Sequence, residues 1–183
     1  MTSEGARGSG QGWHLEGLSA DGPFPEFADK LHLFGQFVGD WEILECRYLE
    51  DDGSWSTSRG RLHWRWILDG RAVQDIWTTI DERTHRSVPV GTTVRFYDPK
   101  IDAWHSLWLS PSQGVVRSFI GRPRGSEIVL EGTNSRGNPV HWIFSEIRPD
   151  SFRWRAEELR NPPSGWVLYE EMRIQRAGSP PKK

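Results

Sequence analysis

The chain of 183 residues suits one domain, and its formal net charge is −2. It contains no run of Lys and Arg, which excludes nucleic acids and anionic membranes as expected partners. The sequence also lacks an apolar run near the roughly 20 residues of a spanning helix and an N-terminal signal-peptide pattern, so we expect a cytoplasmic protein.

The unusual feature of the composition is eleven tryptophans against one cysteine, Cys46. Each tryptophan can bury roughly 150–250 Å², so these rings can supply much of the core. A single cysteine excludes an internal disulfide and a cysteine-rich metal site.

Three segments divide the chain. Residues 1–22 are rich in Gly, Ser and charge, and we interpret them as a flexible arm. Residues 23–176 form the predicted domain, and residues 177–183 form a disordered tail. Between Pro25 and Phe37, apolar residues recur at spacings of four and three, which predicts a short amphipathic helix that closes one end of the domain.

Ten strand-like segments separated by turn signals come after the helix. They cover residues 41–49, 55–68, 71–80, 91–98, 102–110, 114–121, 126–133, 139–147, 151–160 and 165–176. Short turns without intervening helices indicate an antiparallel meander. Because open edges are a liability, we predict an all-β fold, an antiparallel up-and-down barrel of about ten strands.

The hairpin from Leu62 to Thr79 is the clearest part of this pattern. Its first strand alternates strictly, and Asp69-Gly70 is a strong signal for a tight turn with positive φ. Pairing across that turn places Trp66 opposite Val73, Trp64 opposite Asp75 and Leu62 opposite Trp77. A carboxylate then lies on the same face as tryptophans.

Continuing the pairing, with Phe96 opposite Trp104 and Ser118 opposite Ser106, keeps one face largely apolar. The inward residues in this register are Thr92, Val94, Phe96, Trp104, Ser106, Trp108, Val116, Ser118, Ile120, Ile128, Leu130, Trp142, Phe144, Phe152, Trp154, Trp166, Leu168, Glu170 and Met172. The first strand is ambiguous: either Leu44, Cys46 and Tyr48 face inward, or Trp41 and Ile43 do. A bulge would reconcile the two patterns.

Three motifs carry a resemblance to a known family. Gly39-Asp40-Trp41 resembles the Gly-x-Trp that opens the first strand of lipocalins and their calycin relatives, in which an arginine of the last strand covers the tryptophan; here Arg173 or Arg176 would do so. Leu68-Asp69-Gly70-Arg71 and Phe96-Tyr97-Asp98 resemble the "Leu-Gly-Gly-Arg" and "Gly-Tyr-Asp" turns of a bacterial lipocalin-like family of unknown function. The resemblance spans about residues 33–176.

The resemblance implies a lipocalin-like barrel closed at one end, with a cup for a small, mostly apolar ligand. It implies no single activity, because similar barrels carry lipids, bind haem, or catalyse cyclisation, isomerisation or decarboxylation without a cofactor. Function therefore depends on the residues of the site.

Three inward carboxylates are the catalytic candidates: Asp75, Glu158 and Glu170. Rings predicted around Asp75 should raise its pKa, which suits a general acid or base. The alternative is that Asp75 only accepts a hydrogen bond from a Trp N–H or a water. Glu158 and Glu170 are expected near a barrel rim. Together the carboxylates and rings could hold a cationic ligand.

The ligand-binding candidates are the aromatic and small polar residues of the inward face, although about half of the tryptophans are expected to serve packing alone. They are Tyr48, Trp64, Trp66, Trp77, Thr92, Phe96, Trp104, Ser106, Trp108, Ser118, Trp142 and Trp154.

The opposite face is expected to be a solvated outer wall with ion pairs such as Arg117 with Glu131. In the competing interpretation part of it lines a polar lumen, as in barrels that hold fatty-acid carboxylates with an Arg and a Tyr. Arg95-x-Tyr97 has that spacing, and His105 and His141 then become acid–base candidates. We expect no metal and no cofactor; haem on His141 or His105 is the least favoured alternative.

These observations predict binding of a small hydrophobic or cationic molecule by a monomer or homodimer. We expect a cofactor-independent acid/base enzyme of secondary metabolism, of the cyclase, isomerase or lyase kind, in which replacing Asp75 by Asn removes turnover and keeps binding. The alternative is a non-catalytic carrier or sensor, and third comes an interaction module with exposed tryptophans.

Overall fold

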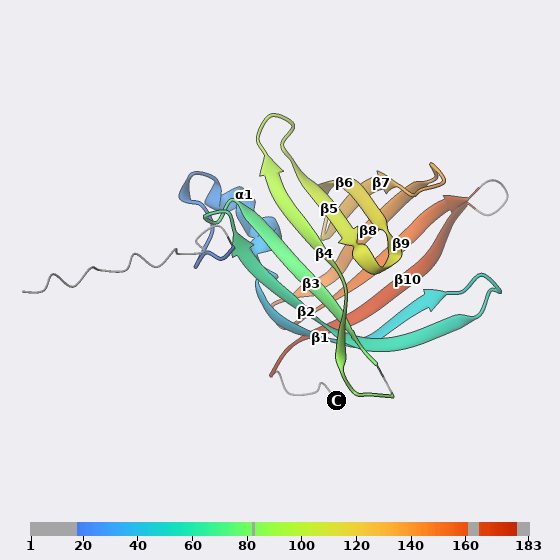
Figure 1. Cartoon of the computed structure of the whole chain (residues 1–183). Coiled ribbons are helices and arrows are strands. Elements are labelled where there is room, and N and C mark those ends of the chain that lie inside the picture. Colours follow the sequence, from blue (N-terminus) through green and yellow to red (C-terminus); the bar gives the residue numbers. More distant parts are fainter. Residues whose placement is uncertain (1–17, 82, 161–164, 179–183) are drawn as a thin grey trace, which may run out of the picture.

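The computed structural model describes residues 18–81, 83–160 and 165–178, and within them it is an all-β barrel with one short helix (Figure 1). The elements are η1 (Pro25–Phe27), α1 (Ala28–Gly35), β1 (Gly39–Leu49), β2 (Trp55–Ile67), β3 (Ala72–Ile80), β4 (Ser87–Asp98), β5 (Ala103–Ser110), η2 (Pro111–Gln113), β6 (Val115–Arg124), β7 (Glu127–Thr133), β8 (Pro139–Arg148), β9 (Ser151–Arg160) and β10 (Gly165–Arg176). The strands form a closed antiparallel barrel in which each pairs with the next and β1 pairs with β10. The predicted fold class is confirmed. The predicted flexible arm (1–22) and disordered tail (177–183) lie mostly outside the described residues, which exclude 1–17 and 179–183.

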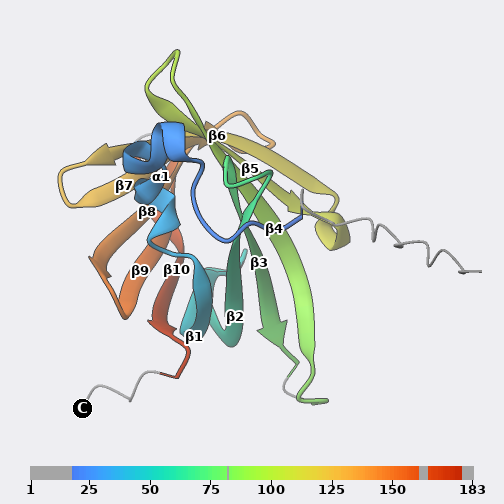
Figure 2. The same cartoon turned by 90° about the vertical axis from the view of Figure 1, so that its left-hand side faces the viewer.

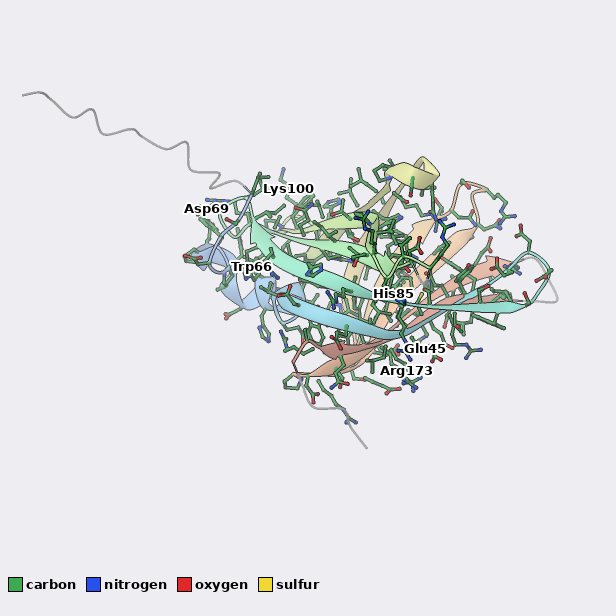
Figure 3. All side chains as sticks on the ribbon, turned by 60° about the horizontal axis from the view of Figure 1, so that its bottom comes forward. Glu45, Trp66, Asp69, His85, Lys100 and Arg173 are labelled. Atoms are coloured by element: carbon green, nitrogen blue, oxygen red, sulfur yellow. The ribbon has the colours of Figure 1, made fainter. Side chains whose placement is uncertain are left out.

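Helix α1 lies at one end of the barrel, as the two views show (Figures 1 and 2). Leu31 and Phe34 are buried, and the ring centroid of Phe34 lies 4.9 Å from that of Trp104 and 5.7 Å from that of Phe144. Trp66 lies at the same end (Figure 3). Its ring fits so closely that a Cβ on Gly35 would come within 2.5 Å of it. The apolar residues of the predicted helix therefore fill this end of the barrel with rings.

The Gly-x-Trp motif is covered by Arg176, which settles the choice between the two arginines. The guanidinium carbon of Arg176 lies 4.1 Å from the ring centroid of Trp41, and its terminal nitrogens donate to the carbonyls of Val38 and Gln36. Gly39 has φ +131°, and a Cβ there would approach Arg176 Nη1 to 2.5 Å. Glycine is thus required both for the backbone conformation and for the close approach of the arginine.

The register of the β2–β3 hairpin is the predicted one. Trp66 pairs with Val73, Trp64 with Asp75 and Leu62 with Trp77. Asp69 and Gly70 have the expected positive φ. The turn is longer than two residues, because Ile67 pairs with Ala72 and Leu68 also adopts a positive φ.

Two strands, β4 and β6, are turned inside out relative to the prediction. Phe96 pairs with His105 instead of Trp104, and Ser106 pairs with Phe119 instead of Ser118. The side chains of Thr92, Phe96 and Ser118 therefore lie on the outer face, and Phe96 is 39% exposed. The prediction that Val94, Val116 and Ile120 face inward is wrong for the same reason, and Val116 is 69% exposed.

The observed register follows from what each face of β4 has to meet. Arg95 comes to lie in the interior beside Asp75, whose charge it balances. Gly91 also faces inward, where a Cβ would come within 2.6 Å of the Trp108 ring. An apolar pattern on the other face of β4 cannot compensate for an unpaired buried carboxylate.

Bulges set the remaining faces. In β1 the register shifts between Ile43 and Cys46, so Trp41, Ile43 and Cys46 are all buried, as the reconciling bulge predicts. In β10 the register with β9 shifts between Leu168 and Glu170, which leaves Tyr169 as the extra residue. Trp166, predicted to face inward, is 42% exposed.

Candidate functional site

The barrel contains a cavity of about 170 Å³, and eight of its eighteen lining residues are aromatic. Five of the predicted ligand-binding tryptophans line it: Trp64, Trp77, Trp108, Trp142 and Trp154. Ring centroids are separated by 5.8 Å between Trp77 and Trp108, 6.1 Å between Trp108 and Trp142, and 5.4 Å between Trp142 and Trp154. The rings contact one another around the cavity, so they form a stiff apolar wall.

Asp75 lines this cavity in an ion pair with Arg95 that sequence reasoning missed. The side chains are 4% and 3% exposed, and the Arg95 guanidinium carbon lies 4.4 Å from the Trp64 ring centroid. Burial raises the pKa of the Asp75 carboxyl, and the opposing charge of Arg95 works against that shift. Burial also lowers the pKa of Arg95, which Asp75 opposes. Each group therefore depends on the other to remain charged inside the barrel.

Glu170 lines the same cavity in different surroundings. Its hydrogen-bond partner is the thiol of Cys46, with Sγ 3.7 Å from Oε1. Burial raises the pKa of Glu170 from 4.5 to about 7, and the Cys46 hydrogen bond and the charge of Arg117 act in the opposite direction. Burial and the nearby Glu170 raise the pKa of the Cys46 thiol, so the thiol stays protonated. Glu170 can therefore gain or lose a proton near neutral pH.

Arg117 and Tyr169 also belong to the polar part of the cavity wall, to which Thr93 and Gln113 contribute as well. Trp142 Nε1 donates to the Tyr169 hydroxyl at 3.2 Å. Burial raises the pKa of Tyr169, whereas the Trp142 hydrogen bond and Arg117 lower it. The sequence predicts the outer wall for Arg117. The inverted register of β6 and the bulge of β10 bring Arg117 and Tyr169 inside.

Glu158, the third catalytic candidate, lies elsewhere. It is 5% exposed and accepts hydrogen bonds from Asn134 Nδ2 at 2.6 Å, Asn138 Nδ2 at 2.7 Å and Arg160 Nε at 3.2 Å. Burial alone would raise its pKa, but these donors hold the pKa below its ordinary value. It lines a separate polar pocket with Asp51 and Arg136, so the structure does not bring it together with Asp75 and Glu170.

The other predicted ligand-binding residues do not line the aromatic cavity. Trp66, Trp104 and Ser106 are buried in the barrel but lie outside its lining, and Tyr48 is 40% exposed. Thr92, Phe96 and Ser118 lie on the outer face. Thr92 donates to the Asp75 carbonyl and the Phe96 ring stacks on His105 at 4.9 Å.

Most of the second face is the expected outer wall. His105 lies 3.2 Å from Asp98, and the His141 ring stacks on Trp166 at 3.9 Å. Glu131 pairs with Arg124 at 2.6 Å, so the predicted pair of Arg117 with Glu131 is wrong. The alternative of a polar lumen holds in part, because Arg95 and Arg117 face inward. Tyr97 does not serve it, since its hydroxyl donates to Asp102.

Metal-ligand clusters and membrane-spanning helices are both absent from the part of the chain that the structure describes. No three His, Cys, Asp or Glu side chains in residues 18–81, 83–160 and 165–178 are grouped so that they could hold a metal ion. No helix in those same ranges has the length and apolar character needed to cross a membrane.

Comparisons with known proteins support the fold. No family model matches the chain. The solved structure of the S-type phycobiliprotein lyase CPES from Guillardia theta is similar, with a TM-score of 0.55 and 13% identity over 81% of this chain and 93% of that one. A Delta(14)-sterol reductase from Ascobolus immersus is 31% identical over 70 residues, which are 35% of this chain and 15% of that protein. The chain thus spans a small part of that curated relative, and the structural likeness supports a lipocalin-like barrel.

Proposed function

We propose that this protein binds a small, mostly apolar molecule in the aromatic cavity and transfers a proton to or from it through Glu170. The observation that carries the proposal is the position of the Glu170 carboxyl in the cavity wall, hydrogen-bonded to a thiol and, among the described residues, without a cation at ion-pair distance. A carboxyl whose pKa is about 7 can act as acid or base at the pH of a cell.

Asp75 is the weaker candidate for this step, although it was the first choice from the sequence. Its carboxylate is held by Arg95, and proton transfer would break a buried ion pair. We propose that Asp75 holds Arg95 in place and that Glu158 fixes the Asn134–Asn138 turn. Membership of the bacterial lipocalin-like family and a role in secondary metabolism stay predictions.

Proton transfer inside an aromatic wall is chemistry that lyases, isomerases and cyclases share, and the structurally similar protein is a phycobiliprotein lyase. The rings would hold a flexible substrate in one conformer, which lowers the entropic part of the barrier. We therefore propose a cofactor-independent enzyme of this group. A carrier that uses the same cavity without turnover is the alternative.

The test is a titration of tryptophan fluorescence with a panel of hydrophobic acids, amines, and polyketide- and terpene-like compounds, followed by mass spectrometry of each mixture. We expect quenching and a new product with the wild-type protein. Glu170→Gln should retain quenching and lose product, and the wild-type rate should change with a midpoint near pH 7 because the pKa of Glu170 is about 7. Glu171→Gln is the matched control, because Glu171 pairs with Arg47 instead of lining the cavity.

Each other result has a defined meaning. Quenching without product by any compound would favour the carrier and overturn the enzyme. Full turnover by Glu170→Gln would remove Glu170 from the mechanism. If no compound in the panel quenches fluorescence, the cavity does not serve as a binding site for this class of molecule.

A further inference from the structure

We propose that the cavity selects molecules with a carboxylate or a similar oxyanion, held by Arg117 and Tyr169, on an apolar body that packs among the tryptophans. This inference rests on the proposed function and specifies the chemistry of its ligand. It differs from the cationic ligand that the three carboxylates suggested from the sequence.

The charges that line the cavity favour an anion. Four charged side chains line it: Asp75, Arg95, Arg117 and Glu170. Asp75 and Arg95 balance each other in their ion pair. Glu158, which would have added negative charge, lies in the other pocket. The net charge of the cavity wall therefore depends on Arg117 and Glu170. It is positive whenever Glu170 is protonated.

Arg117 is the arginine of the cavity wall that has no ion-pair partner among the described residues. Among the described residues it has no carboxylate within ion-pair distance, whereas Arg95 and Arg124 each have one and Arg155 has two. A guanidinium can donate two parallel hydrogen bonds to a carboxylate, so an unpaired one on an apolar wall is suited to an oxyanion.

Tyr169 supplies a second donor beside it. Its hydroxyl oxygen accepts a hydrogen bond from Trp142 Nε1, which leaves the O–H proton free to point at a ligand. Arg117, Tyr169 and Glu170 line the same cavity, and Arg117 interacts with the Tyr169 side chain through a hydrogen bond and with Glu170 through its charge. The five cavity tryptophans surround the space in which the apolar body of such a ligand would lie.

The experiment compares two probes of the same shape, 1-naphthoate and 1-naphthalenemethanol, by isothermal titration calorimetry at pH 6. The wild-type protein should bind the acid more tightly. Hydrogen bonds to charged groups contribute about 1.5–3 kcal/mol. Arg117→Met should therefore lower the affinity for the acid by roughly 10- to 100-fold and leave the affinity for the alcohol unchanged. Tyr169→Phe should lower the affinity for the acid by a smaller factor. Arg124→Met, on the same strand but paired with Glu131 outside the cavity, should change neither affinity.

Other outcomes separate this inference from the proposed function. Equal affinities for the two probes in the wild-type protein, or an equal loss of both in Arg117→Met, would overturn the oxyanion site and leave an apolar binding cavity. If neither probe binds and neither quenches tryptophan fluorescence, binding of small apolar molecules in this cavity is itself wrong.

Discussion

Asp75 and Glu170 are two carboxyl groups in one aromatic cavity, and their neighbours give them different roles. Asp75 lies against Arg95, which in turn lies over the Trp64 ring. Glu170 lies against a protonated thiol. In an interior of low polarity, a cation partner keeps a carboxylate charged and fixed, whereas a neutral partner leaves it free to titrate. The partner, more than the surrounding rings, therefore decides whether a buried acid stabilises the fold or takes part in chemistry.

The largest effect should come from breaking the first pair. Arg95→Met leaves Asp75 buried without a cation, and we expect the free energy of unfolding at pH 7 to fall by about 3–5 kcal/mol. Urea denaturation monitored by tryptophan fluorescence measures this change in the free energy of unfolding. The double variant Asp75→Asn/Arg95→Met should recover most of the loss, because it removes both charges of the pair.

Arg65→Met is the matched control for that experiment, since Arg65 pairs with Asp40 on the exposed surface. Its expected cost is below about 1 kcal/mol. A loss as small as this in Arg95→Met would show that the Asp75–Arg95 pair does not hold the barrel together.

The second carboxyl should make stability depend on pH. Because the pKa of Glu170 is raised from 4.5 to about 7, the folded state binds its proton more tightly than the unfolded state does. The resulting stabilisation is fully present below about pH 4.5 and is lost as the pH rises through about 7, by on the order of 3 kcal/mol. Urea denaturation from pH 4.5 to 8 should show this slope in the wild-type protein.

Glu170→Gln should remove that slope, because an amide does not titrate. Glu171→Gln, which removes a carboxyl outside the cavity, should keep it. Parallel curves for the wild-type protein and Glu170→Gln would mean that Glu170 has the same affinity for its proton in the folded and unfolded states.

The smallest expected effect, that of Val116→Thr, tests the register that places Arg95 and Arg117 inside the barrel. Val116 is 69% exposed on β6, so Val116→Thr should change the free energy of unfolding by no more than about 0.5 kcal/mol. Phe119→Ala, on the inward face of the same strand, should cost about 3–5 kcal/mol. The reverse order would support the register in which Val116 faces the core and Arg117 faces solvent.

The sequence was sufficient to predict the ten strands, the closing helix and the face of Asp75. Strict alternation and an Asp-Gly turn fix the β2–β3 hairpin locally, so its register could be read without knowing the rest of the barrel. The covering arginine was narrowed to two residues, of which the structure selects Arg176.

The register of β4 and β6 could not be read in the same way, because both faces of these strands carry apolar residues. Phe96 and Val116 on the outside offer as good an apolar pattern as the residues on the inside. One signal was present: a carboxylate predicted among tryptophans needs a cation, and Arg95 is two residues from Thr93, the residue that pairs with Asp75. The inward position of Arg117 followed from the same shift along the sheet.

The bulge in β10 could not be predicted for a different reason, because no residue type in the strand indicates its position. Regular alternation would allow only one of Tyr169 and Glu170 to face inward, yet both line the cavity. This has an evolutionary consequence. A bulge is a one-residue insertion in a strand, so the gain or loss of a single codon in β10 would change which groups meet the ligand without any substitution of a pocket residue. Specificity in barrels of this kind can therefore change through insertions and deletions within strands, as well as through exchange of the residues in the wall.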